Sequence, residues 1–249
     1  MADGFERVMI PSVGITFKGQ HRIAGSLLFD VELCLPSGQW TCLLGRSGVG
    51  KSTVLQLILD LETGGEFQGT MTATDGLPLT DRISYMAQSD LLLPWLCVLD
   101  NVCIGARLRG EKPDIVRAKS LLDRVGLGQH TTKKPAALSG GMRQRAALAR
   151  TLFEDRPIVF LDEPFSALDA GTRADMQELA AEVLEGRTVL LVTHDPAEAT
   201  RVAHQIIVMS AQAATVWPVP NTPALREINA PETLDCQAHL LAYLRETAA

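Results

Sequence analysis

A glycine-rich segment carries the strongest chemical signal in the sequence. Residues 45–52 read GRSGVGKS and follow a short apolar run. Glycines let several backbone N–H groups point at one spot, and such a nest before a helix N-terminus attracts a multiply charged anion. Gly45 and Gly50 bracket four residues and precede Lys51 and Ser52, which is the spacing of a nucleotide phosphate loop. The segment therefore predicts nucleotide binding rather than a simple turn with a surface lysine.

The residues of this segment have roles that follow from their chemistry. Lys51 would reach the β- and γ-phosphates of a nucleotide, and the hydroxyl of Ser52 would ligate Mg²⁺. A helix from about Ser52 to Leu61 would direct its positive N-terminal end at the same phosphates. The other residues expected to line the nucleotide are Gly45, Arg46, Ser47, Gly48, Val49, Gly50 and Thr53.

Two adjacent carboxylates follow a second apolar run, in RPIVFLDEP at residues 156–164. An aspartate at a strand end that faces a phosphate loop is well placed to hold Mg²⁺, usually through water. The next carboxylate can take a proton from an attacking water. We therefore assign Asp162 to the metal and Glu163 to general-base catalysis. Such a pair can also cap a strand or a helix, but Lys51 in the same chain favours the catalytic interpretation.

A second glycine pair occurs in LSGGMRQR, residues 138–145. Ser139 stands in N-cap position before a helical pattern, and this arrangement by itself predicts only a capped helix start. A serine hydroxyl and free N–H groups at a helix N-terminus also form an anion site. One chain with two phosphate-binding ends and one catalytic centre suggests that two chains share nucleotides. The candidate residues of this second site are Ser139, Gly140, Gly141 and Met142.

Three compact apolar runs rich in β-branched residues predict strands that are covered on both faces of a parallel sheet: Thr41–Leu44, Ile158–Leu161 and Val189–Thr193. The first run precedes the glycine-rich segment, the second precedes Asp162, and the third precedes His194. Ligands of open α/β sheets bind at the carboxyl ends of the strands. We therefore expect these three endings to form one site.

The remaining elements are expected around this parallel sheet. Residues 1–40 predict antiparallel strands, because apolar and polar residues alternate from Phe29 to Leu35. A second antiparallel pair is predicted from Gly69–Thr74 and Ile83–Gln88, on either side of an Asp75-Gly76 turn. The expected organisation is one domain over residues 1–249, with an inserted helical subdomain at about 89–156, a strand at Gln205–Met209, and a C-terminal extension at about 210–249 that ends in a helix from Pro231 to Glu246.

The composition excludes several function classes. The net charge of −6 over 249 residues makes nucleic acid an unexpected partner, since nucleic-acid-binding proteins usually carry a basic surplus. The five cysteines are scattered and form no C-x-x-C pair, which argues against a disulfide framework or a zinc site. The segment MADGFERVMI has no secretory pattern, and no run approaches the roughly 18 apolar residues of a membrane span. We expect the chain to remain in the cytosol.

Taken together, these motifs resemble those of the ATPase subunit of an ATP-binding-cassette (ABC) transporter, in the family's order from about Met9 to Met209. The matching segments are Gly45–Ser52 (Walker A), Gln88 (Q-loop), Leu138–Met142 (signature), Ile158–Glu163 (Walker B), Ser166–Asp169 (D-loop) and His194 (switch histidine). The resemblance implies an α/β P-loop NTPase cassette with a mostly parallel core sheet, an antiparallel β subdomain and an inserted helical subdomain. It also implies ATP and Mg²⁺ as cofactors.

The resemblance assigns roles that the isolated residues do not. In the family two subunits stack head to tail with ATP at the interface, so Ser139 and Gly141 of one chain would cap the γ-phosphate held by Lys51 of the other. Asp169 of the D-loop is included among the nucleotide-site residues for the same reason. We therefore expect a homodimer.

Three further residues take roles from the resemblance. Gln88 would contact Mg²⁺, the attacking water and the membrane partner, and His194 would hold the γ-phosphate near Glu163. Without the resemblance, Gln88 is a polar strand-end residue and His194 a surface-loop histidine. Phe17 is similar to the family's adenine-stacking aromatic residue, and an ordinary core phenylalanine is an equal alternative.

The segment QSDLLLPWLCVLDNV, residues 88–102, narrows the type of transporter. Leu91 to Leu99 are consecutive apolar residues that belong in part to a helical core. A Pro94-Trp95 pair in a loop is unfavourable to expose unless a partner covers it. In importers of the family this surface receives the permease. The segment is similar to the branch that imports nitrate, sulfonates, taurine and thiamine precursors, and the run from Gly186 to Ala199 is most similar to the hydroxymethylpyrimidine importers.

The expected function is therefore an ATP-hydrolysing importer subunit on the cytoplasmic face of the inner membrane, bound to integral-membrane permease subunits and indirectly to a substrate-binding protein. The substrate would be a thiamine pyrimidine precursor or a sulfonate- or nitrate-type solute. A non-transport ABC ATPase that acts as a scaffold or switch is the alternative. A kinase built on the same phosphate loop has no use for Ser139–Gly141 or His194.

Overall fold

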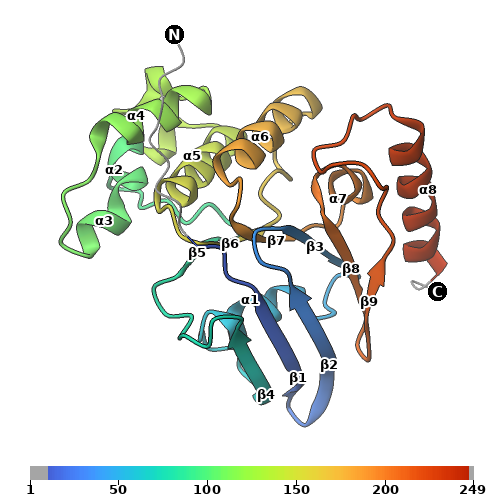
Figure 1. Cartoon of the computed structure of the whole chain (residues 1–249). Helices are drawn as coiled ribbons and strands as arrows, with labels where there is room; N and C mark the ends of the chain where they lie inside the picture. Colours follow the sequence, from blue (N-terminus) through green and yellow to red (C-terminus); the bar gives the residue numbers. More distant parts are fainter. Residues whose placement is uncertain (1–10, 247–249) are drawn as a thin grey trace.

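The computed structural model describes residues 11–246 and contains two β-sheets with helices around them (Figure 1). The first sheet has the strand order β2-β1-β4, and the second has the order β5-β6-β7-β3-β8-β9. The strands are β1 (Ile15–Ile23), β2 (Ser26–Leu35), β3 (Trp40–Gly45), β4 (Glu66–Ala73), β5 (Ile83–Met86), β6 (Ile158–Asp162), β7 (Thr188–Val192), β8 (Gln205–Met209) and β9 (Ala214–Trp217).

The six-stranded sheet is the centre of the molecule. Strands β5, β6, β7, β3 and β8 are parallel, and only β9 joins antiparallel to its neighbour. Every residue of β6 and β7 is buried, as their apolar sequences predict. Side chains of successive residues point to opposite faces. Leu190 of β7 belongs to the core under the antiparallel sheet, whereas its neighbours Val189 and Leu191 belong to the core under the helices.

Helices cover the two faces of this sheet unequally. Helices α5 (Gly140–Phe153), α6 (Ala170–Val183) and α7 (Pro196–Val202) lie on one face, and α1 (Lys51–Ile58) lies on the other, between the two sheets (Figure 1). Helix α1 is shorter than the predicted helix from 52 to 61, because Leu59 caps it and Asp60 takes a positive φ of 56°. The predicted α/β cassette architecture is thus present, with a mostly parallel core sheet and a separate antiparallel sheet.

The antiparallel sheet confirms one sequence prediction and corrects another. Strands β1 and β2 pair antiparallel, and the buried residues of β2 alternate with exposed ones as predicted. The predicted pairing of 69–74 with 83–88 is wrong, because β4 pairs with β1 while β5 pairs parallel with β6 in the other sheet. The Asp75-Gly76 turn does form, since Gly76 N donates to Ala73 O. The local sequence determines that a turn forms here, but it does not determine the strand with which β5 pairs.

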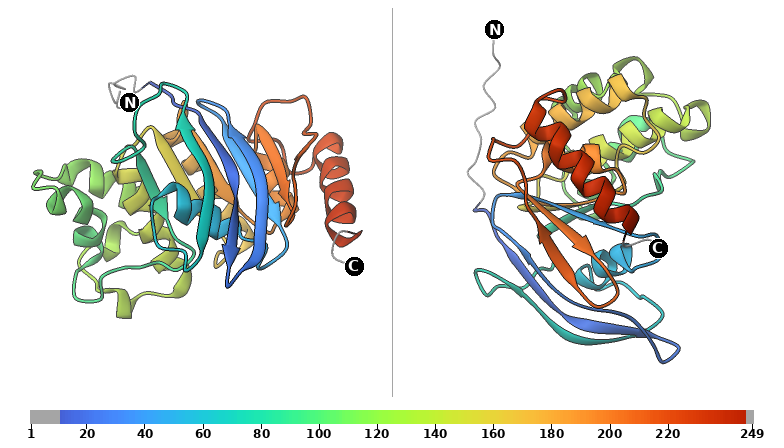
Figure 2. Two further views of the ribbon diagram at one scale, coloured as in Figure 1. Left: turned by 90° about the horizontal axis from the view of Figure 1, so that it is seen from below. Right: turned by 90° about the vertical axis from the view of Figure 1, so that its right-hand side faces the viewer.

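Figure 2 shows the remaining helices on opposite sides of the molecule. Helices α2 (Val98–Val102), α3 (Ile104–Leu108) and α4 (Ile115–Arg124) gather with α5 on one side, together with the short 3-10 helices η1 (Gly128–His130) and η2 (Pro135–Ala137). Helix α8 (Pro231–Glu246) lies on the other side and packs against α7.

Two sequence expectations concern residues outside the part of the chain that the structure describes. These are the absence of a secretory pattern in residues 1–10 and the start of the motif order at Met9. Within the described part, none of the helices is long and apolar enough to span a membrane.

Candidate nucleotide-binding and hydrolysis site

The phosphate loop connects the end of β3 to the start of α1. Its glycines at positions 45, 48 and 50 have φ values of 154°, 81° and 102°, which side chains rarely adopt. A Cβ atom on Gly45 would lie 2.4 Å from the backbone oxygen of Met209, and one on Gly50 would lie 2.6 Å from the ring of Phe29. Backbone conformation and close packing therefore both require glycine in this loop.

Lys51 lies at the first position of α1 and turns back over the loop. Its Nζ donates to the carbonyl oxygens of Gly45 at 2.8 Å and Arg46 at 2.9 Å. Burial lowers the pKa of Lys51, and the carboxylates of Glu163 and Asp162 oppose that shift. The ammonium group is therefore held at the mouth of the loop by groups that a phosphate oxygen can replace.

Two of the three residues predicted to hold Mg²⁺, Ser52 and Asp162, lie together beside this loop, whereas the third, Gln88, contacts Glu163. Asp162 ends β6 with a side chain that is 4% exposed, and it accepts a hydrogen bond from Ser52. Burial raises the pKa of Asp162, whereas the Ser52 bond and the charge of Lys51 lower it. A carboxylate and a hydroxyl next to a phosphate site are the oxygen donors that Mg²⁺ prefers, so the pair fits this ion.

Glu163 is the point at which three distant segments meet. Its Oε2 accepts a hydrogen bond from Gln88 Nε2 at 3.2 Å, and its Oε1 lies 3.1 Å from His194 Nδ1. Its backbone N–H donates to Val192 O at 2.9 Å, and its φ of 50° lies in the left-handed region. Such strain persists only where the surrounding structure fixes the backbone, as the hydrogen bond to Val192 does here. The structure thus brings together the three residues predicted to be catalytic.

The second predicted anion site forms a separate group at the start of α5. Ser139 caps this helix by accepting from the N–H of Met142 at 3.3 Å. A Cβ atom on Gly141 would lie 3.2 Å from the carbonyl oxygen of Ala167, so the glycine allows close contact with the D-loop. Ser139 and Gly140 are exposed. This end of the helix is accessible to a second molecule.

Asp169 caps α6 and is exposed, and its side chain accepts from the N–H of Thr172 at 3.0 Å. Hydrogen bonds from Thr172 lower the pKa of Asp169. The structure therefore places Asp169 at a helix start on the surface, one residue after the buried Leu168.

Gln144 is a site residue that sequence reasoning missed. Its Nε2 donates to Glu163 O at 3.0 Å and to Ser166 Oγ at 3.3 Å, and its Oε1 accepts from Ala167 N at 2.9 Å. The side chain is buried and thus ties α5 to Glu163 and the segment after it. A polar residue on the apolar face of the helix, one turn before Leu148, is the signal that identifies it.

Phe17 does not fit the role suggested by the resemblance. Its side chain is 0% exposed and packs between Phe29 and Phe67, with ring-centroid distances of 6.2 and 5.3 Å. A ring enclosed in this way has no free face for an adenine. Phe17 is a core residue between the two sheets, which corrects the expectation that it stacks on the nucleotide.

The arrangement of a phosphate loop, Ser139–Met142 and His194 has counterparts among known proteins. Residues 28–166 match the family model described as ABC transporter. The chain belongs to the ABC transporter family. It is an ATP-binding subunit of that family and an ATPase, and its fold is the ABC cassette.

Three relatives illustrate the similarity. An uncharacterized ABC transporter ATP-binding protein of Haemophilus influenzae is 41% identical, over 95% of this chain and 98% of that protein. An aliphatic sulfonates import ATP-binding protein of Agrobacterium fabrum is 46% identical, over 74% of this chain and 70% of the relative. The ATP-binding cassette MJ0796, solved as a dimer bound to ADP and Pi, is 29% identical with a TM-score of 0.70, over 86% of this chain and 99% of that chain.

A buried carboxylate behind His194 generates a prediction about pH. Glu198 in α7 is 5% exposed, and burial raises its pKa to about 7, although hydrogen bonds from Thr193 and Gln177 lower it. Between about pH 4.5 and 7 the folded chain therefore binds one more proton than the unfolded chain. Its free energy of unfolding should fall as pH rises through this window, by up to about 1.4 kcal/mol per pH unit for one proton.

Glu198→Gln should remove this slope, since glutamine does not titrate. The measurement is urea unfolding of both proteins from pH 4.5 to 8. The stability of the variant relative to the wild type should increase up to pH 7 and then level off. The matched control is Glu232→Gln, at an exposed position of α8, which should follow the wild type. Parallel curves for Glu198→Gln and the wild type would show that Glu198 keeps an ordinary pKa.

Proposed function

We propose that this chain is the ATP-hydrolysing subunit of an importer of aliphatic sulfonates, and that it works as a homodimer with ATP at the interface. The observation that carries the hydrolytic part is Glu163, held by Gln88 and His194 beside the loop of Lys51. The sulfonate part is supported by the similarity to the relative of Agrobacterium fabrum. The thiamine-precursor substrate that the sequence also suggested has no support among the relatives described above.

In this proposal the phosphate loop binds ATP, and side chains in and beside the loop orient its phosphates. The ammonium group of Lys51 leaves the carbonyl oxygens of the loop and binds the β- and γ-phosphates. Ser52, Asp162 and Gln88 would hold Mg²⁺, which supplies charge neutralisation on the phosphates when bound. Burial around Lys51 and Asp162 strengthens these interactions, because charges act more strongly where water is excluded.

Glu163 is the proposed general base. One of its oxygens accepts from Gln88 and the other lies beside His194, and each oxygen keeps a second lone pair that can take the proton of an attacking water. When a nucleotide binds, His194 would turn from Glu163 and donate a hydrogen bond to the γ-phosphate.

The second nucleotide-binding surface comes from the partner chain in this proposal. Ser139, Gly140, Gly141 and Met142 present a capped helix N-terminus, and Asp169 lies at the start of the adjacent α6. ATP would drive transport by binding the closed dimer more tightly than the open one, because a ligand shifts an equilibrium only by its differential affinity.

Glu163→Gln should abolish steady-state ATP hydrolysis to below about 1% of the wild-type rate, since a neutral amide cannot accept the proton. ATP binding should remain within about threefold, because the phosphate loop is untouched. The measurement is phosphate release, together with equilibrium dialysis of ATP. Wild-type hydrolysis by the variant would disprove the role of Glu163 as the base.

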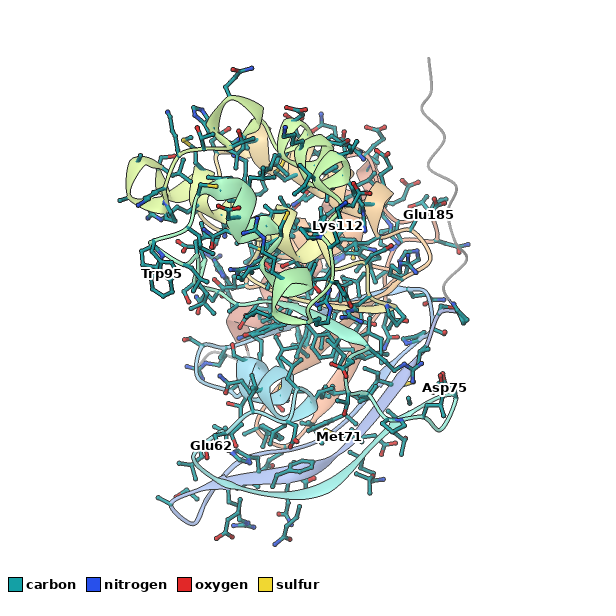
Figure 3. The ribbon with its side chains drawn as sticks, turned by 90° about the vertical axis from the view of Figure 1, so that its left-hand side faces the viewer. Glu62, Met71, Asp75, Trp95, Lys112 and Glu185 are labelled. Atoms are coloured by element: carbon teal, nitrogen blue, oxygen red, sulfur yellow. The ribbon has the colours of Figure 1, made fainter. Side chains whose placement is uncertain are left out.

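The proposed permease contact lies in the loop between β5 and α2. The Trp95 side chain lies at the surface and is 65% exposed (Figure 3). This loop is nevertheless held firmly, since Asn101 Nδ2 donates to the carbonyl oxygens of Leu93, Leu96 and Cys97. Leu91, also held by Arg150, is 61% exposed. An exposed aromatic side chain on an anchored loop is typical of a partner contact.

Trp95→Asp should therefore reduce co-purification with the permease at least tenfold and leave phosphate-loop binding of ATP unchanged. The matched control is Leu77→Asp, because Leu77 is 60% exposed but lies in the loop after β4, near Asp75 on the other side of the view in Figure 3. The measurement is affinity purification from detergent-solubilised membranes. Equal permease recovery with both variants would place the contact elsewhere.

The same purification from the native host tests the transport assignment and the proposed location on the cytoplasmic face of the inner membrane. A polytopic permease and a substrate-binding protein should accompany the chain. The captured binding protein should be stabilised in a thermal-shift assay by ethanesulfonate and not by hydroxymethylpyrimidine. Stabilisation by hydroxymethylpyrimidine would reverse the substrate choice. Recovery of only non-membrane partners would support the scaffold or switch alternative.

A further inference from the structure

The turn that presents His194 to Glu163 is fixed from behind. Thr193 N–H donates to Leu43 O at 3.3 Å, and Thr193 Oγ1 accepts from Asp195 N at 3.1 Å. Asp195 in turn caps α7, because its Oδ1 accepts from Ala197 N at 2.9 Å. His194 therefore lies between two residues whose backbones are anchored, while its own side chain is 67% exposed.

One guanidinium group joins this turn to the D-loop. Arg173, in the first turn of α6, donates from Nη1 to Asp195 Oδ2 at 3.2 Å and from Nη2 to Leu168 O at 3.1 Å. The two side chains of the ion pair are about one-third exposed. The planar fork of arginine suits two acceptors at once, which a lysine cannot match. Arg173 thus bridges the segment before α6 and the turn before α7.

A small cavity connects this bridge with the catalytic carboxylate. Its volume is about 50 Å³, and its polar lining comes from Glu163, Ser166, Arg173, Thr193, His194, Asp195 and Glu198. Among these residues, Arg173 donates to Asp195 in the His194 turn and to Leu168 in the D-loop. Its positive charge also lowers the pKa of Glu198. Arg173 and Glu163 thus line the same cavity, with the His194 turn between them.

We propose that Arg173 is a positioning residue for ATP hydrolysis. Through Asp195 it fixes the position of His194 relative to Glu163, and through Leu168 it links that position to the D-loop. The inference rests on the proposed hydrolytic function of the same site. The side-chain hydrogen bonds of Arg173 go to Asp195 and Leu168 and reach neither the phosphate loop nor Glu163, so its effect passes through the His194 turn. A misplacement of about 1 Å in such a site can reduce a rate on the order of 100-fold.

The first test compares Arg173→Ala with Arg124→Ala in the purified full-length chain. Arg124 also reaches a carboxylate of α6, through Glu182, but on the surface beside α4. Arg173→Ala should lower kcat for ATP hydrolysis at least fivefold and leave KM for ATP within twofold, because the phosphate loop is intact. Arg124→Ala should keep both constants. A loss of general folding would instead appear as a lower melting temperature and a reduced active fraction.

The second test asks whether Arg173 acts through Asp195. Asp195→Asn keeps a side chain that can cap α7 but removes the charge that Arg173 contacts. If the two residues form one unit, Arg173→Ala should cost less than twofold in the Asp195→Asn background, whereas independent effects would multiply. Arg173→Lys should lie between the wild type and Arg173→Ala. If the alanine variant does not fold, Arg173→Lys in both backgrounds decides the same question.

The outcomes separate the inference from the function on which it rests. A wild-type chain that does not hydrolyse ATP would overturn the proposed function. An active wild type, with kcat of Arg173→Ala within twofold of it, would overturn the role of Arg173. Parallel changes in kcat and KM, or multiplicative costs with Asp195→Asn, would also overturn it.

Discussion

The candidate site depends on one strained carboxylate that is held by its surroundings. Glu163 has a φ of 50°, a conformation that costs a non-glycine residue on the order of 1–3 kcal/mol. It persists because its N–H donates to Val192 and its carboxylate is held by Gln88 and His194. The parallel pairing of β6 with β7 sets the spacing of these groups. Gln88 and His194 therefore meet at this one residue.

Burial is the common cause of the site's electrostatics. It lowers the pKa of Lys51 and raises the pKa of Asp162 and Glu198, since a low-polarity environment disfavours either charged form. The central sheet is covered on both faces, so its polar groups collect at the carboxyl ends of the strands. Opposite charges placed there partly offset each other's desolvation, and an incoming phosphate and metal would complete the balance.

Much of the site could be predicted because its motifs are local. The phosphate loop needs glycines at fixed positions for backbone conformation, and Lys51 follows them directly in the chain. The sequence could not decide between the two alternatives for Phe17, because a strand has the same pattern whether a second sheet or a ligand covers its aromatic residue, and the structure encloses the ring in the core. The predicted pairing of β5 with β4 was wrong for a related reason, since a turn does not specify the partner with which the following strand pairs. Gln144 and Arg173 were missed because their partners are far away in the sequence.

The sequence by itself determined the segments proposed to bind phosphate and the apolar strands that carry them, because each depends on residues that are neighbours in the chain. The order of these motifs along the chain also indicated the family. Tertiary structure decided which side chains meet at Glu163 and which aromatic residues are enclosed. It also decided that one arginine joins the D-loop to the His194 turn. These contacts depend on the stacking of two sheets and on crossover connections, and the free energy that selects them comes from burial across the whole core rather than from any short stretch of chain.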